Sequence, residues 1–167
     1  ILQGRFEEGL RLARESRAIA QALGDQEGLG LSLLAVGRAT TFLGDFTEGQ
    51  SLLQECLQVF DNLGRRGWIV MAHAALAEVN LHLGHAAEAR LHAGISLAVS
   101  RETGLHYRAG LALFLMGRVA LAEGFYEEAG QLLEEALRVY QGIGARAGAG
   151  WAHAILAYVA REMGRPA

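Results

Sequence analysis

Two stretches of the chain, 80 residues apart, decide its fold: residues 44–64, GDFTEGQSLLQECLQVFDNLG, and residues 124–144, GFYEEAGQLLEEALRVYQGIG. In both stretches apolar residues recur at three- and four-residue steps, which is the spacing of an amphipathic α-helix. Leu53 and Phe60 of the first stretch are matched in register by Leu133 and Tyr140 of the second. Each stretch begins and ends on glycine. The pattern therefore predicts one helix in each stretch, bounded by turns.

Glycine marks the same spacing along the whole chain. Glycine is favoured just past a helix end, because it adopts the left-handed conformation without a Cβ clash. Nine of the 22 glycines fall on one lattice of 20 residues: Gly4, Gly24, Gly44, Gly64, Gly84, Gly104, Gly124, Gly144 and Gly164. Between them we predict eight helices joined by short turns, near residues 5–23, 26–43, 46–63, 66–83, 86–103, 106–123, 126–143 and 146–163.

The constant repeat predicts the architecture. Short turns force neighbouring helices to be antiparallel, and a fixed period of 40 residues stacks the hairpins into a superhelix. The expected fold class is all-α, an α-solenoid of helical hairpins in which residues 1–167 form one array. The repeats are expected at residues 1–24 (half), 25–64, 65–104, 105–144 and 145–167 (half). Because the chain starts at Ile1 and stops just after Gly164, Arg165 and Pro166, we expect it to be part of a longer protein.

Composition restricts the classes of partner. The formal net charge is −3, so charge gives no reason to expect binding to nucleic acid or to an anionic membrane. The single cysteine, Cys56, excludes an internal disulfide and fits a reducing compartment. No run of about 18 apolar residues and no signal peptide is visible. The expected location is therefore the cytoplasm.

Small residues recur where two helices must approach closely. In the first helix of each hairpin they are in the pairs Val36-Gly37, Leu76-Ala77, Met116-Gly117 and Leu156-Ala157. In the second helix they are Gly9, Gly49, Ala89 and Ala129, followed by Ser16, Cys56, Ser96 and Ala136. In these positions the chain resembles the tetratricopeptide repeat (TPR) family. It departs from the family in its period of 40 residues, and in Thr40, Asn80, Ala120 and Ala160, where the family has an aromatic residue. The longer period is similar to that of bacterial sensor arrays in maltose-regulator-like and other STAND-type ATPases.

The resemblance implies a right-handed superhelix whose first helices, at 26–43, 66–83, 106–123 and 146–163, line a concave groove. The groove residues that it implies are Leu34, Arg38, Phe42, Met71, Glu78, His82, Phe114, Arg118, Trp151 and Tyr158. Arginine and aromatic residues are the types that anchor interfaces. A protein or peptide partner is therefore expected, although the same residues could simply pack between neighbouring helices.

Histidines raise the question of a metal site. His82 and His85 are three residues apart but are separated by a turn, and His85 and His92 could share a helix face. No cysteine or carboxylate cluster completes a tetrahedral set of ligands. His73 and His153 stand where other repeats have leucine, which suggests partly buried packing roles. We expect no metal.

No motif indicates a cofactor or a reaction. The glycine-rich residues 142–148 follow a predicted helix, whereas a dinucleotide loop follows a strand, and a phosphate-binding loop of the Walker type needs a lysine that the chain lacks. Adjacent glutamates such as Glu127 and Glu128 point about 100° apart on a helix, so they do not form a catalytic pair. No nucleophile–base set is apparent. We therefore expect no cofactor and no enzymatic activity.

Three functions remain open. The leading hypothesis is a protein-interaction and sensor scaffold in a larger bacterial signalling or transcription-regulating ATPase. The second is a module that oligomerises through its open repeat ends or apolar faces. The third is a domain that senses a small ligand. Fold alone does not decide between them.

Overall fold

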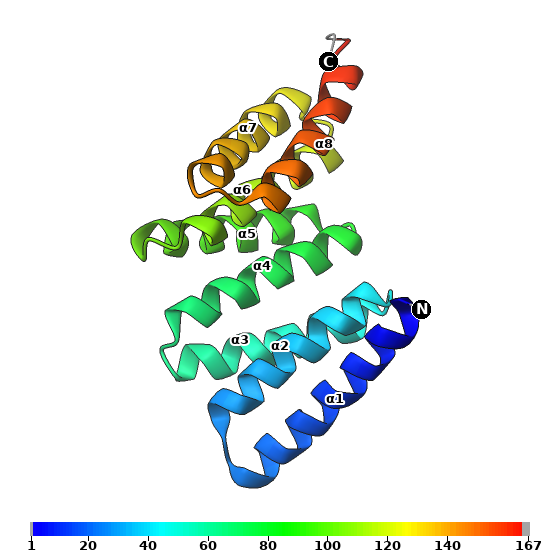
Figure 1. Ribbon diagram of the computed structural model, residues 1–167, viewed down its shortest axis with the longest axis vertical. Helices are drawn as coiled ribbons and strands as arrows, with labels where there is room; N and C mark the ends of the chain where they lie inside the picture. Colours follow the sequence, from blue (N-terminus) through cyan, green and yellow to red (C-terminus); the bar gives the residue numbers. More distant parts are fainter. Residues whose placement is uncertain (1, 165–167) are drawn as a thin grey trace.

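The computed structural model describes residues 2–164, with side chains from residue 8 onward, and every element in that range is an α-helix (Figure 1). The helices are α1 (Leu2–Leu23), α2 (Gln26–Phe42), α3 (Phe46–Asn62), α4 (Arg66–His82), α5 (Ala86–Glu102), α6 (His106–Ala122), α7 (Tyr126–Gly142) and α8 (Arg146–Glu162). Arg165 and Pro166, which mark the end of the array in the sequence argument, lie outside the described residues.

The turns are built as the glycine lattice predicts. Gly44 has a φ of 96°, and seven further lattice glycines, from Gly24 to Gly164, also have positive φ. At the end of α2 the N–H of Asp45 donates to the carbonyl of Thr40 at 3.1 Å, and that of Gly44 donates to Thr41 at 3.0 Å. This pair of bonds is the Schellman motif, which satisfies the last carbonyls of a helix. The predicted turns therefore have a physical cause that recurs from hairpin to hairpin.

Helix boundaries agree with the prediction to within one residue for α2 to α8. The first helix is the exception, because α1 begins at Leu2 and includes Gly4, where a turn was expected. A glycine inside a helix costs only about 1 kcal/mol relative to alanine, so spacing alone does not make it a turn. The expectation of a turn at Gly4 was wrong.

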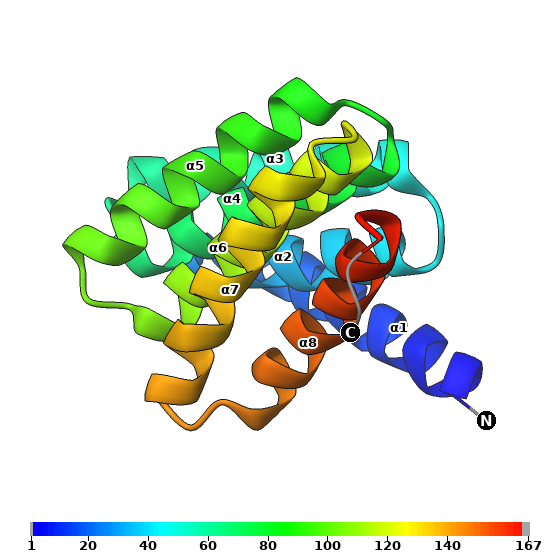
Figure 2. The same ribbon diagram turned by 90° about the horizontal axis from the view of Figure 1, so that it is seen from above.

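The eight helices form two layers. Consecutive helices pack as antiparallel neighbours, and α4 also packs against α2 and α6, while α6 also packs against α8. Within the described range the backbones of α1, α3, α5 and α7 make no comparable contacts with one another. The hairpins climb the long axis from α1 to α8 in Figure 1, and from above α1 and α8 lie on one side with α3 and α5 on the other (Figure 2). The closer layer, α2, α4, α6 and α8, therefore forms the inner, concave face.

Glycine on an inner helix makes room for a large residue on the outer helix. A Cβ on Gly37 would lie 2.9 Å from Cγ of Leu53, and one on Gly117 would lie 2.8 Å from Cγ of Leu133. The middle hairpin, α4–α5, instead pairs Ala77 with a buried alanine at position 93. The first and third hairpins therefore share one packing solution, and the second uses another.

Candidate functional site

The inner face carries a cavity of about 740 Å³ between α2 and α4. Its lining residues come from α2, α3, α4 and α6: Ala35, Arg38, Ala39, Thr41, Phe42, Phe46, Leu53, Ala75, Glu78, His82 and Arg118. This volume is within the usual range of ligand pockets, roughly 300–1,000 Å³.

A second cavity of about 280 Å³ lies between α4 and α6. It is lined by Arg38, Met71, Ala74, Ala75, Glu78, Leu111, Phe114, Leu115, Arg118 and Trp151. The two cavities share Arg38, Ala75, Glu78 and Arg118, so they adjoin at a charged centre. We call the two cavities together the groove.

The groove brings together most of the residues that the resemblance implies. Arg38, Phe42, Glu78, His82 and Arg118 line the first cavity, and Met71, Phe114 and Trp151 join in the second. Their role as a binding surface remains a prediction.

Leu34 and Tyr158 lie elsewhere. Leu34 is buried in the cluster between α2 and α3 and packs rather than lines the groove. Tyr158 is exposed on α8, where the guanidinium of Arg161 lies 4.9 Å from the centre of its ring. Neither residue lines either cavity.

Phe46 was not among the predicted groove residues, although it lines the first cavity. This residue begins α3, an outer helix, yet its ring stacks on His82 of α4 with centres 4.9 Å apart and planes 3° from parallel. Both residues of the stack line the first cavity. No sequence signal pointed to it, because the prediction drew groove residues from the inner helices alone.

At the charged centre, opposite charges do not balance. Nη1 of Arg118 lies 3.5 Å from Oε1 of Glu78, and the Arg118 guanidinium also lies 5.9 Å from the centre of the Phe114 ring. Arg38 makes no hydrogen bond or ion pair with any residue that the structure describes. Two arginines therefore face one glutamate.

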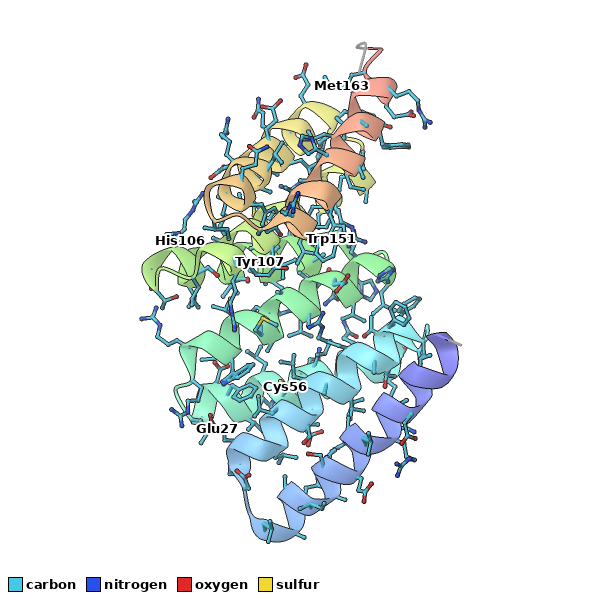
Figure 3. All side chains as sticks on the ribbon, in the orientation of Figure 1. Glu27, Cys56, His106, Tyr107, Trp151 and Met163 are labelled. Carbon is cyan, nitrogen blue, oxygen red and sulfur yellow. The ribbon has the colours of Figure 1, made fainter. Side chains whose placement is uncertain are left out.

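The aromatic end of the second cavity is open. Trp151 on α8, labelled in Figure 3, is 51% exposed. The centre of its ring lies 6.4 Å from that of Phe114, with the ring planes 41° apart. Phe42 is also exposed at the opposite end of the groove. Exposed aromatic rings beside arginine are the composition of interface hot spots.

Away from the groove, two histidines meet that the sequence argument did not pair. Nδ1 of His73 on α4 lies 2.8 Å from Nδ1 of His92 on α5. Burial, and the neighbouring His92, lower the pKa of His73 to about 4, and burial also lowers the pKa of His92. Among the described residues, no group of three or more His, Cys, Asp or Glu side chains is placed to hold a metal ion.

The packing role expected for His73 and His153 applies only to the first. His73 is buried between α4 and α5. His153 is exposed, because no helix of the described range covers that face of α8. The expectation for His153 was therefore wrong.

No family model matches the sequence. Over 141 residues the chain is 31% identical to the regulatory protein AfsR of Streptomyces griseus, a match that covers 84% of this chain and 13% of the regulator. The chain thus spans a small part of the regulator's length.

Solved structures confirm the fold. The crystal structure of BtubC from P. vanneervenii superposes with a TM-score of 0.78 at 19% identity, covering 95% of this chain and 66% of that one. TPR-like repeats of a kinesin light chain-like protein from Podosopora anserina superpose with a TM-score of 0.69 at 19% identity. The match covers 99% of this chain and 92% of that one. At these identities the likeness shows the fold alone. The chain is a TPR-like α-solenoid.

No helix in residues 2–164 combines the length and the apolar character that crossing a lipid bilayer requires.

Proposed function

We propose that this chain is a protein-interaction and sensor scaffold, and that its groove binds a protein, peptide or effector on behalf of a larger bacterial regulator. The observation that carries the proposal is the groove itself, where Phe42 and Trp151 expose their rings on either side of two arginines. A concave inner layer of helices is the surface that solenoids generally use for binding.

The sequence similarity to AfsR supports the regulatory context. The match covers 84% of this chain but 13% of that protein, so other domains would convert binding into a response. We propose that residues 1–167 form one repeat array in such a protein, with a nucleotide-hydrolysing domain of the STAND type elsewhere in it. The proposed location is the cytoplasm, and the proposed array has no catalytic activity, no cofactor and no nucleic acid or membrane partner.

Site-specific photo-cross-linking tests this proposal. A photoreactive phenylalanine analogue placed at position 42 or 151 should yield a discrete cross-linked partner in cells that make the protein. The same analogue at Arg138, an exposed position on the outer helix α7, is the matched control. Equal yields of adduct from position 138 and from the groove positions would contradict the proposal. The absence of any adduct from both position 42 and position 151 would contradict it as well.

Self-association is a second candidate, favoured by α1. Leu12, Ile19 and Leu23 are 51%, 54% and 76% exposed and lie along one stripe of the helix. The residue equivalent to Leu12 in α3, Leu52, is buried against α2. If the stripe joins copies, light scattering should show a mass above 17.9 kDa that Leu12→Glu lowers. A constant monomer mass across concentrations would exclude this candidate.

A small-ligand sensor is the third candidate, favoured by the 740 Å³ volume of the first cavity. The cross-linking experiment separates it from the leading proposal. A ligand enclosed in the first cavity would leave positions 42 and 151 without a protein adduct.

A further inference from the structure

We infer that the groove holds a carboxylate side chain of its partner between Arg38 and Arg118, with apolar side chains of the same partner segment in the two flanking cavities. The inference rests on the proposed function, since it names the kind of segment that the groove would bind. The partner segment is therefore an amphipathic stretch with an Asp or Glu between two apolar residues.

Hydrogen-bond donors are in surplus at the centre of the groove. A guanidinium has five N–H donors and no acceptor. Glu78 is the acidic residue of the groove, and its separation of 3.5 Å from Arg118 is at the outer limit of a hydrogen bond. Arg38 has no acceptor among the described side chains. Arg38 is exposed, so water accepts from its donors in the free chain. An occupant that displaces this water must supply acceptors instead, and a carboxylate supplies two oxygens that match the guanidinium fork.

The charge at the centre of the groove is positive. The whole chain carries a net charge of −3, yet the centre of the groove has two arginines against one glutamate. Arginines on the outer surface are mostly paired: Arg17 with Glu55 at 3.0 Å, and Arg90 with Glu128 at 2.6 Å. The groove is thus a local positive site on an acidic protein. Complementary charge favours an acidic group there and disfavours a basic one.

Aromatic surface lies on both sides of the charged centre. The ring stack of Phe46 and His82 borders the first cavity, together with exposed Phe42. Phe114 and Trp151 border the second. An isolated anion would leave these surfaces in water, whereas a segment with an apolar residue on each side of its carboxylate would cover both. A nucleic acid or an anionic lipid surface would instead need a broad basic face, which the paired outer arginines do not provide.

The helix spacing sets the probe. The cavities lie on either side of α4, and packed helices lie roughly 10 Å apart. On a helical peptide that distance is about seven residues at the standard rise per residue. The probe is a fluorescein-labelled, acetylated and amidated helical peptide of about 15 residues. It carries Leu at positions i and i+7 and Glu at i+4, and its matched partner carries Gln at i+4.

Fluorescence anisotropy of each peptide, titrated with the chain, tests the inference. The Glu peptide should bind at least about tenfold more tightly than the Gln peptide, since a charge-assisted hydrogen bond is lost. Arg38→Gln should weaken binding of the Glu peptide about tenfold and leave binding of the Gln peptide unchanged. Arg138→Gln should change the binding of neither peptide. Added salt should weaken binding of the Glu peptide but not that of the Gln peptide. Circular dichroism of each variant confirms that the helices remain.

The outcomes separate the inference from the proposed function. Equal affinity of the Glu and Gln peptides for the groove would overturn the inference that Arg38 and Arg118 hold a carboxylate. The proposal that the groove binds peptides would still stand. An equal effect of Arg38→Gln on both peptides would overturn the inference in the same way. Failure of both peptides to bind at millimolar concentration would also overturn it, and the cross-linking from positions 42 and 151 would then decide the proposed function separately.

Discussion

At the scale of single residues, the fold depends on small residues that let two helices approach. Gly117 of α6 and Leu133 of α7 show the principle, because Leu133 is fully buried in the space that a Cβ on Gly117 would need. Gly110 and Gly148 similarly leave room for the ring of Tyr140. Close packing of this kind is sensitive to one added methyl group.

The Gly117→Ala variant should therefore be less stable. Its Cβ would lie 2.8 Å from Cγ of Leu133, a contact that forces the core to shift at a cost of about 1–3 kcal/mol. Urea unfolding followed by circular dichroism measures the change. Gly130→Ala is the control, since the nearest atom to its Cβ is 3.8 Å away and alanine favours the helix by up to about 1 kcal/mol. Equal stability changes in the two variants would contradict this account of the packing.

The Tyr140→Phe variant should be as stable as the parent or more so, by up to about 1 kcal/mol. The hydroxyl of Tyr140 is buried and has no hydrogen-bond partner among the described residues, so its removal ends a desolvation cost. Phe60 fills the equivalent space in α3 without a hydroxyl. A loss of more than about 1 kcal/mol on thermal or urea unfolding would mean that the hydroxyl has a partner.

At the scale of helices, the sequence predicted most elements because each one follows from local chemistry. The positive φ of Gly44 and the carboxylate of Asp45, which accepts the N–H of Glu48 at 3.1 Å, end one helix and begin the next. Such signals lie within a few residues of the boundary that they define. Gly4 shows the limit of prediction from spacing alone. It occupies the same lattice position as the turn glycines but lies inside α1.

Contacts between helices were harder to predict. The Nδ1 atoms of His73 and His92 lie 2.8 Å apart, although the two residues are 19 positions apart in the sequence and on different helices. This contact depends on how α4 and α5 are rotated about their axes. Phe46 enters the groove from an outer helix for the same reason. Periodicity identifies the buried face of a helix, but it does not give the partner of each side chain on that face.

The histidine pair makes the α4–α5 hairpin sensitive to pH. Burial and the neighbouring His92 lower the pKa of His73 to about 4, so below its ordinary value of 6.5 the unfolded chain binds more protons than the folded one. Asp61 opposes this shift at His73, and Glu88 opposes the one at His92. The stability that the neutral pair contributes is present above pH 6.5 and is lost as the pH falls towards 4. The free energy of unfolding should drop by about 2 kcal/mol from His73 between pH 7 and pH 5.

The His73→Leu variant should lose much of this pH dependence. Leucine occupies the equivalent buried positions Leu33 and Leu113, so the side chain fits and cannot titrate. Urea unfolding at pH 7 and pH 5 measures the difference. His153→Leu on the exposed face of α8 should leave the pH dependence unchanged. If His73→Leu lost as much stability between pH 7 and pH 5 as the parent protein does, groups other than His73 would control the pH dependence.

At the scale of the whole molecule, the array has two kinds of surface. The outer ridge is crossed by ion pairs such as Arg17–Glu55 and Arg101–Glu135, which suit a solvated face. The inner face has the exposed rings of Phe42 and Trp151, and an arginine, Arg38, that forms no ion pair with another described residue. This asymmetry is the reason to locate binding in the groove rather than on the ridge.

Amide hydrogen exchange of the chain, with and without the partner recovered by cross-linking, tests the central claim most directly. The account predicts slower exchange in the inner helices α2, α4 and α6 and in α8 around Trp151, and unchanged exchange in the outer helices α5 and α7. Protection confined to α5 and α7, or to α1, would contradict a binding groove on the inner face.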